Sequence, residues 1–125
     1  MKEVVIIGVG GGIGAILRFL FSRGVHGVLG LNFPYGTLFV NVVGSFCMGL
    51  LAVFLMDRLG EWSNLLRAFL LIGLLGGFTT FSTFSYEVVD LWENGEAFKM
   101  IVYLLLSLLL CFGGTFIGLI FGRKI

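Results

Sequence analysis

The stretch GGFTTFSTFSYE, residues 76–87, interrupts the third of four apolar runs in this 125-residue chain. Two adjacent glycines are followed by hydroxyl side chains and phenylalanines. As one continuous helix, the run from about residue 66 to 92 would rise about 40 Å, whereas the hydrocarbon core of a bilayer is about 30 Å thick. We therefore expect a membrane-spanning helix that is broken near its middle, at these residues.

The composition is that of an integral membrane protein. Hydrophobic residues make up 58% of the chain and charged residues 12%, against about 25% charged residues in soluble domains. The apolar runs cover residues 4–21, 36–56, 66–92 and 98–121, and each comes close to or exceeds the length of about 20 residues that a transmembrane helix needs. We expect an all-α, multi-pass protein of the inner (plasma) membrane, with residues 1–125 forming one domain of four transmembrane helices.

The connections between these spans are short. Residues 22–35 include His26 and Pro34, and we expect a surface or partly re-entrant connection there, with His26 in an interfacial loop. Trp62 lies in the polar turn before the third span, where interfacial aromatic residues are common. With the N-terminus inside, five basic residues would be cytoplasmic and three embedded or opposite. This bias is too weak to fix one orientation by the positive-inside rule.

Glycines recur at four-residue spacing in the first and last spans. Small residues at this spacing form a face on which a neighbouring helix can approach closely. The pairs are Gly8/Gly12, Gly10/Gly14, Gly114/Gly118 and Gly118/Gly122.

Several classes of function are poorly supported. The formal net charge of +1 gives no basic surface for nucleic acid or for anionic lipid. Gly10, Gly12 and Ala15 match a dinucleotide-binding fingerprint, but that fold needs an acidic residue about 20 positions later. No Asp or Glu lies between Glu3 and Asp57. The chain also lacks a phosphate-binding loop and a catalytic constellation, so we do not expect an enzyme.

Polar side chains form a ladder on each of two spans. Because residues four apart lie at successive turns of one helix face, each ladder would run along a single side of its helix. The second span carries Thr37, Asn41 and Ser45, and the fourth carries Tyr103, Ser107, Cys111 and Thr115. One interpretation is interhelical hydrogen bonding, which averages only about 0.6 kcal/mol per contact in membranes. The other is a track of donors without fixed charge, suited to an anion that must enter and leave.

Asn41 favours the second interpretation, because leaving amide donors unpaired in hydrocarbon costs several kcal/mol. The two cysteines, Cys47 and Cys111, both fall inside predicted spans. There a cysteine usually acts as a small packing residue, and we expect that role for both.

The broken segment itself carries groups that can meet ions. Non-helical backbone at membrane depth is tolerated only where it is buried in protein or lines a cavity, and hydroxyls such as those of Thr79 and Thr80 can satisfy local backbone groups. Freed carbonyl oxygens can also coordinate a hard cation. Phe81 and Phe84 are three residues apart and share a helix face. Their positively polarised ring edges can solvate a small anion.

Two alternatives stay open at this point. A proton-coupled small multidrug exporter needs a carboxylate in mid-membrane, and only Glu87 lies plausibly within the membrane boundary. A non-transporting membrane assembly subunit would use the polar ladders only as glue between helices.

The motif GGFTTFSTFSYE, with GTLFVNVVGSF at residues 36–46 and the glycine-rich first span ending in Arg18, resembles the Fluc (CrcB) family of fluoride ion channels. The resemblance covers nearly the whole chain, including its length and four-span layout. It implies a fluoride-specific channel that passively exports toxic fluoride from the cytoplasm. It also implies an antiparallel, dual-topology homodimer with two pores and a central structural sodium ion, Na+, on the two-fold axis.

The resemblance also assigns roles to individual residues. Backbone carbonyls of Gly76 and Thr79 from each subunit would hold sodium, and Arg18 would lie near a vestibule. The fluoride pore would be lined first by Asn41, Phe81 and Phe84, then by Thr37, Ser82 and Thr83. By extension of the track along the fourth span, it would include Ser107 and Thr115. Expected partners are fluoride, a second copy of the chain and membrane lipid, without nucleic acid.

Overall fold

A computed structural model describes residues 1–60 and 63–125, and the predicted interfacial Trp62 lies outside them. The described residues form helices joined by short connections, with no β-strand among them. The elements are α1 (Lys2–Leu29), α2 (Tyr35–Arg58), α3 (Ser63–Arg67), the π-helix η2 (Ala68–Leu75), α4 (Gly76–Phe78), α5 (Phe81–Glu93) and α6 (Ala97–Lys124).

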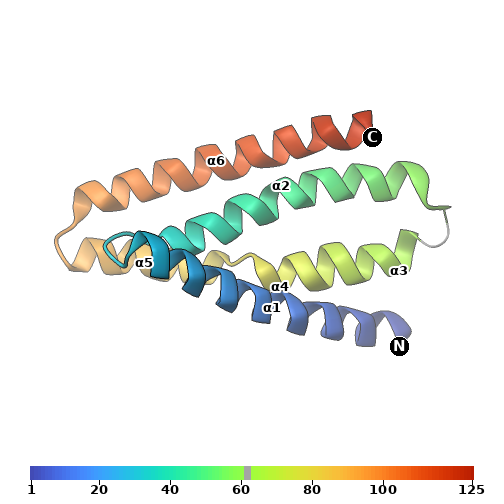
Figure 1. Cartoon of the computed structure of the whole chain (residues 1–125), viewed down its shortest axis with the longest axis horizontal. Coiled ribbons are helices and arrows are strands. Elements are labelled where there is room, and N and C mark those ends of the chain that lie inside the picture. Colours follow the sequence, from blue (N-terminus) through green and yellow to red (C-terminus); the bar gives the residue numbers. More distant parts are fainter. Residues whose placement is uncertain (61–62) are drawn as a thin grey trace.

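Four segments are long and apolar enough to cross a membrane: α1, α2, the run Ser63–Glu93 that holds α3 to α5, and α6. The predicted all-α protein with four transmembrane helices is therefore confirmed. In Figure 1, α1 and the third segment run in one direction, and α2 and α6 run in the other. The two termini lie at the same end of the molecule, as an even number of crossings requires.

The first helix is longer than its apolar run. It continues to Leu29 instead of ending near residue 21, so His26 lies in the last turn of α1 and the prediction of a loop over residues 22–35 was wrong. A helix need not stop where its hydrophobic residues do, and no proline occurs before Pro34 to end it. Gly30 ends it with a φ of 87°, and its N–H donates to the carbonyl of His26 over 2.9 Å.

Glycines bring helix backbones into contact at several places. On α1, a Cβ at Gly14 would collide with the carbonyl oxygen of Leu74 in η2, and on α6 a Cβ at Gly118 would collide with the carbonyl oxygen of Phe46 in α2. By contrast, a Cβ at Gly12 would meet no atom within 4 Å. Of the two spacings predicted on the first span, Gly10/Gly14 is thus the one that packs against a neighbouring helix within the chain.

The π-helix η2 was not predicted by the residue pattern. Such segments are rare, and they are frequent at functional sites. It forms where α1 comes unusually close: a Cβ at Gly73 would lie 2.9 Å from the carbonyl oxygen of Ile7, and one at Gly77 would collide with that of Gly11. The widened turn lies directly before the segment quoted at the start.

The buried core is small. Among the described residues, eight apolar side chains are buried, whereas large apolar side chains such as Phe98 (81% exposed) and Phe112 (72%) face outward. The main core cluster joins Phe84 and Leu91 of α5 to Tyr103 of α6. Outward apolar surface of this extent suits contact with lipid or with another protein chain.

Candidate functional site: a recess beside a helix interruption

Thr79 and Thr80 separate α4 from α5. Both have extended backbone, with φ and ψ of −87° and 156° for Thr79 and of −151° and 117° for Thr80. The Thr80 hydroxyl then starts α5 as its N-cap, because its Oγ1 accepts from the N–H of Thr83 over 3.2 Å. On the other side, the Thr79 hydroxyl donates to the carbonyl of Leu75 over 2.9 Å.

Asn41 of α2 supports this interruption from across the molecule. Its Oδ1 accepts from the N–H of Thr80 over 2.8 Å, and its Nδ2 donates to the carbonyl of Thr80 over 3.1 Å. One side-chain amide therefore satisfies both backbone groups of an extended residue, as buried backbone polar groups require. The second hydrogen on Nδ2 is left for another acceptor.

Two carbonyl oxygens lose their helical donors at the same place. In a continuous α-helix, the carbonyl of Gly76 would accept from the N–H of Thr80, and that of Thr79 from the N–H of Thr83. Here the Thr80 N–H is bound to Asn41, and the Thr83 N–H is bound to the Thr80 hydroxyl. These are the two carbonyls that the resemblance assigns to sodium.

A recess of about 360 Å³ opens beside the interruption. Its lining comes from α2, the interruption, the start of α5, and α6, and most of its surface is apolar. The lining residues are Asn41, Gly44, Ser45, Met48, Thr79, Thr80, Phe81, Phe84, Ser107, Leu108, Cys111, Phe112 and Thr115. Five of the predicted pore residues, Asn41, Phe81, Phe84, Ser107 and Thr115, are thus brought to one place. Their roles in ion passage stay predictions.

The two phenylalanines occupy different environments. Their ring centroids lie 5.7 Å apart with an interplanar angle of 53°. The Phe84 ring is buried and packs edge-on against Tyr103, at a centroid distance of 5.1 Å. Phe81 is 79% exposed, so its ring is held from one side only.

Two hydroxyl side chains of the α6 ladder line the recess, Ser107 and Thr115, and they differ in their hydrogen bonding. Thr115 Oγ1 donates to the carbonyl of Ser45 over 3.2 Å, which ties α6 to α2. Ser107 is only 7% exposed, and its hydroxyl oxygen has no hydrogen-bond partner among the residues that the structure describes. A buried hydroxyl without a partner costs free energy unless a bound species supplies one. Thr115 therefore links α6 to α2, whereas the Ser107 hydroxyl keeps an unused donor.

Of the other predicted residues, Thr79 lines this recess, whereas the rest do not. Ser82 and Thr83 join the hydroxyl cluster around Thr80, at 3.3 Å and 3.1 Å from its Oγ1. Gly76 lies in α4, just before the interruption. Arg18 lies within α1, which contributes no side chain to the lining.

Thr37 points instead to a carboxylate. Its hydroxyl donates to Oε1 of Glu87 over 2.7 Å, and the hydroxyl of the buried Tyr103 donates to Oε2 over 2.7 Å. Sequence reasoning considered Glu87 only as an exporter's acid and missed this three-residue group. The available signal was the position of Glu87, which lies deeper inside the third apolar run than Asp90.

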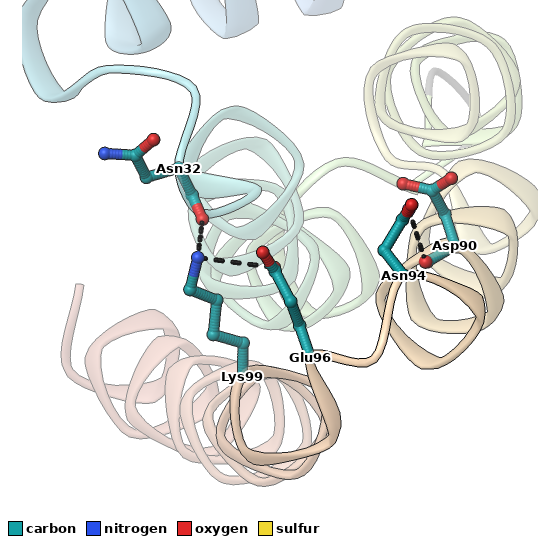
Figure 2. Close-up of polar contacts among 5 residues, drawn as sticks. All are labelled: Asn32, Asp90, Asn94, Glu96 and Lys99. Atoms are coloured by element: carbon teal, nitrogen blue, oxygen red, sulfur yellow. Dashed lines mark hydrogen bonds and ion pairs between the residues drawn. The ribbon is translucent and has the colours of Figure 1, made fainter.

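Glu87 also borders a second, polar cavity of about 380 Å³ at the end of the molecule where α5 meets α6. Figure 2 shows the polar contacts that Lys99 makes at this end. Its Nζ donates to the carbonyl of Asn32 over 3.0 Å and lies 3.3 Å from Oε2 of Glu96, so one ammonium group joins the two connections. The Nδ2 of Asn94 donates to the carbonyl of Asp90 over 2.8 Å and ends α5.

Four apolar segments long enough to cross a membrane define a multi-pass membrane protein, with a largely apolar recess beside the interruption of its third segment. The family model for CrcB-like protein, Camphor Resistance (CrcB), matches residues 5–119, and the chain belongs to this family. The predicted membership of the Fluc (CrcB) family is thereby confirmed.

Curated relatives carry the name fluoride-specific ion channel FluC. One from Aquifex aeolicus is 45% identical over the full length of both chains, and one from Coxiella burnetii is 43% identical over 98% of this chain and 99% of its own. One from Methylococcus capsulatus is 44% identical over 95% of this chain, which spans 52% of that relative's length. The family's function is of the channel type, so the prediction that the chain is not an enzyme is confirmed.

Proposed function

We propose that the chain is a passive fluoride channel of the inner (plasma) membrane that exports fluoride from the cytoplasm. The name carried by its relatives supports this function. Hydrogen fluoride enters cells as a neutral weak acid and dissociates in the more alkaline cytoplasm. A passive channel then lets the trapped anion leave down its electrochemical gradient, without a coupled proton.

The observation that carries the proposal is the recess beside Thr79 and Thr80. It offers the amide of Asn41, the unpartnered hydroxyl of Ser107 and the ring of Phe81, and its lining contains no charged side chain. Ring edges and neutral donors can replace part of an anion's hydration shell. A site without countercharge binds weakly enough for the ion to leave again, which conduction requires.

The working unit is an antiparallel, dual-topology homodimer with two pores, in which each third span crosses the bilayer as a broken helix. A single chain leaves Phe81 79% exposed at the recess, so one wall of the path is missing. A second, inverted copy would supply that wall and bury the interrupted segment, as membrane-embedded irregular backbone requires. The weak bias of basic residues along the sequence is compatible with both orientations.

The carbonyls of Gly76 and Thr79 would hold the central sodium ion, two from each copy. Hard cations prefer oxygen ligands, and the N–H donors that these carbonyls would meet in a helix are bound to Asn41 and to the Thr80 hydroxyl. The donor chemistry therefore fits sodium. In this role the ion would hold the two interrupted helices together without taking part in fluoride passage.

Fluoride efflux from liposomes tests the function. Purified protein is reconstituted with internal potassium fluoride, and efflux is started with valinomycin, which supplies the compensating potassium flux. Rapid efflux without a proton gradient supports a channel. Efflux or drug uptake only under an imposed proton gradient would support the exporter instead, and retention of fluoride as in empty liposomes would contradict both.

Two variants test the assigned residues in the same assay. Phe81→Ile should abolish efflux, because it removes the ring edge while keeping an apolar side chain; Phe98→Ile, an equally exposed phenylalanine outside the recess, is the matched control. Asn41→Asp should also block efflux, since a carboxylate in the recess repels an anion. Normal efflux through Phe81→Ile would remove the aromatic role from the proposal.

A further inference from the structure

The recess contains a thiol whose role the proposed function does not explain. Cys111 lies on its wall, one helical turn after Ser107 on α6, whereas the other free cysteine, Cys47 on α2, is not part of the lining. Both thiols are partly exposed. The two thiols are therefore similarly buried, but only Cys111 lines the recess.

The surroundings of Cys111 suit a small guest. Ser107 is 7% exposed, its hydroxyl lacks a partner, and it lines the same recess. Residues four apart on a helix have Cβ atoms about 5–6 Å apart, so a group bound at one of these side chains lies within reach of the other. The rest of the nearby wall is apolar, formed in part by Leu108 and Phe112.

We propose that Cys111 is a modification site for small, uncharged, thiol-directed electrophiles, and that the adduct obstructs the recess. The recess offers few donors, so a charged reagent larger than fluoride would lose more hydration on entering than its wall can replace. The Ser107 hydroxyl can donate a hydrogen bond to the reagent or to its leaving group. The proposed modification is based on the position of Cys111 in the recess wall, whereas its effect on fluoride flux rests on the proposed function.

Methyl methanethiosulfonate is the probe of this class. The Cys111 sulfur attacks the sulfenyl sulfur of the reagent, the bond from that sulfur to the sulfonyl sulfur breaks, and methanesulfinic acid leaves with the thiol proton. The products are a methyl disulfide on Cys111 and methanesulfinic acid; the thiol is oxidised and the thiosulfonate is reduced. The adduct carries no charge, so no uncompensated ion remains within the membrane span.

The experiment compares Cys47→Ser with Cys111→Ser, so that each protein carries one cysteine, in liposomes treated with the reagent. Intact mass should report one methylthio adduct on Cys47→Ser. Its fluoride efflux should fall by about tenfold or more, because the adduct removes a site that the ion must enter, and dithiothreitol should restore it. The residual efflux of Cys111→Ser should not respond to the reagent.

Ser107→Ala, made in the Cys47→Ser background, tests the assistance by the hydroxyl. We expect about fivefold slower labelling of Cys111, the effect of one lost neutral hydrogen bond. Absence of labelling on folded protein, with labelling after denaturation, would overturn the site. Labelling with unchanged efflux would overturn the obstruction. Labelling of a protein that conducts no fluoride at all would support the site and contradict the proposed function.

Discussion

Replacing Asn41 by alanine should loosen the interruption between α4 and α5. The Asn41 amide bonds both the N–H and the carbonyl of Thr80, over 2.8 Å and 3.1 Å. Alanine removes both contacts and leaves an extended residue without partners for its backbone. Asn41→Asp keeps an acceptor for the Thr80 N–H but puts a charged oxygen in place of the donor to the Thr80 carbonyl, so it tests the loss of that donor separately.

The size of the effect follows from these two bonds. A buried polar group left unpaired costs about 1–3 kcal/mol, whereas interhelical hydrogen bonds in a membrane average about 0.6 kcal/mol. The two bonds therefore stabilise the interrupted segment, bound to Asn41, by between about 1 and about 6 kcal/mol relative to its locally opened state. Because about 1.4 kcal/mol corresponds to a factor of ten, the lower bound of about 1 kcal/mol should make local opening at least about fivefold more frequent in Asn41→Ala.

Hydrogen–deuterium exchange measures this opening directly. Peptides covering residues 79–83 should exchange at least about fivefold faster in Asn41→Ala than in the unaltered protein. They should also exchange faster in Asn41→Asp than in the unaltered protein. Peptides from the first half of α1 serve as the internal reference and should be unchanged. Equal exchange over residues 79–83 in all three proteins would refute the bracing role of Asn41.

Two further substitutions test the packing and the cap. Gly14→Ala should destabilise the fold by about 1–3 kcal/mol through overpacking against Leu74. Gly12→Ala, whose added Cβ would meet no atom within 4 Å, should be neutral or slightly stabilising. Denaturation in SDS measures the stability of both variants, and equal losses would contradict the packing. Thr80→Val should cost about 1 kcal/mol by removing the acceptor of the Thr83 N–H. Thr80→Ser should retain it, and a valine variant as stable as the serine variant would argue against the cap.

Hydropathy was sufficient to predict the helices because each must bury its own backbone polar groups in lipid. The run lengths located the four crossings, and the glycine spacing located the Gly10/Gly14 face that packs on η2. Helix ends were harder to predict. Residues 22–29 are less apolar than the preceding run but remain compatible with a helix, so α1 extends to Leu29.

The contacts that shape the site depend on residues far apart in sequence. The spacing of Asn41 and Thr37 predicted a shared face, but the partners of their side chains, Thr80 and Glu87, are 39 and 50 residues away. Only the relative placement of α2 and α5 decides those pairs. The same limit applies to Ser107 and Thr115, which are equivalent in the pattern but differ in whether α2 offers an acceptor.

The number of residues in the π-helix η2 sets how the following helices, α4 and α5, are rotated about their axis. An α-helix turns by about 100° per residue, so deleting a single position within Ala68–Leu75 while the π turn persists would swing Phe81 round to a different neighbour. The loss would leave hydropathy, glycine content and the quoted motif intact. Insertions and deletions in these eight residues should therefore impair function far more than substitutions do. They would rotate Phe81 away from its place without unfolding the helix.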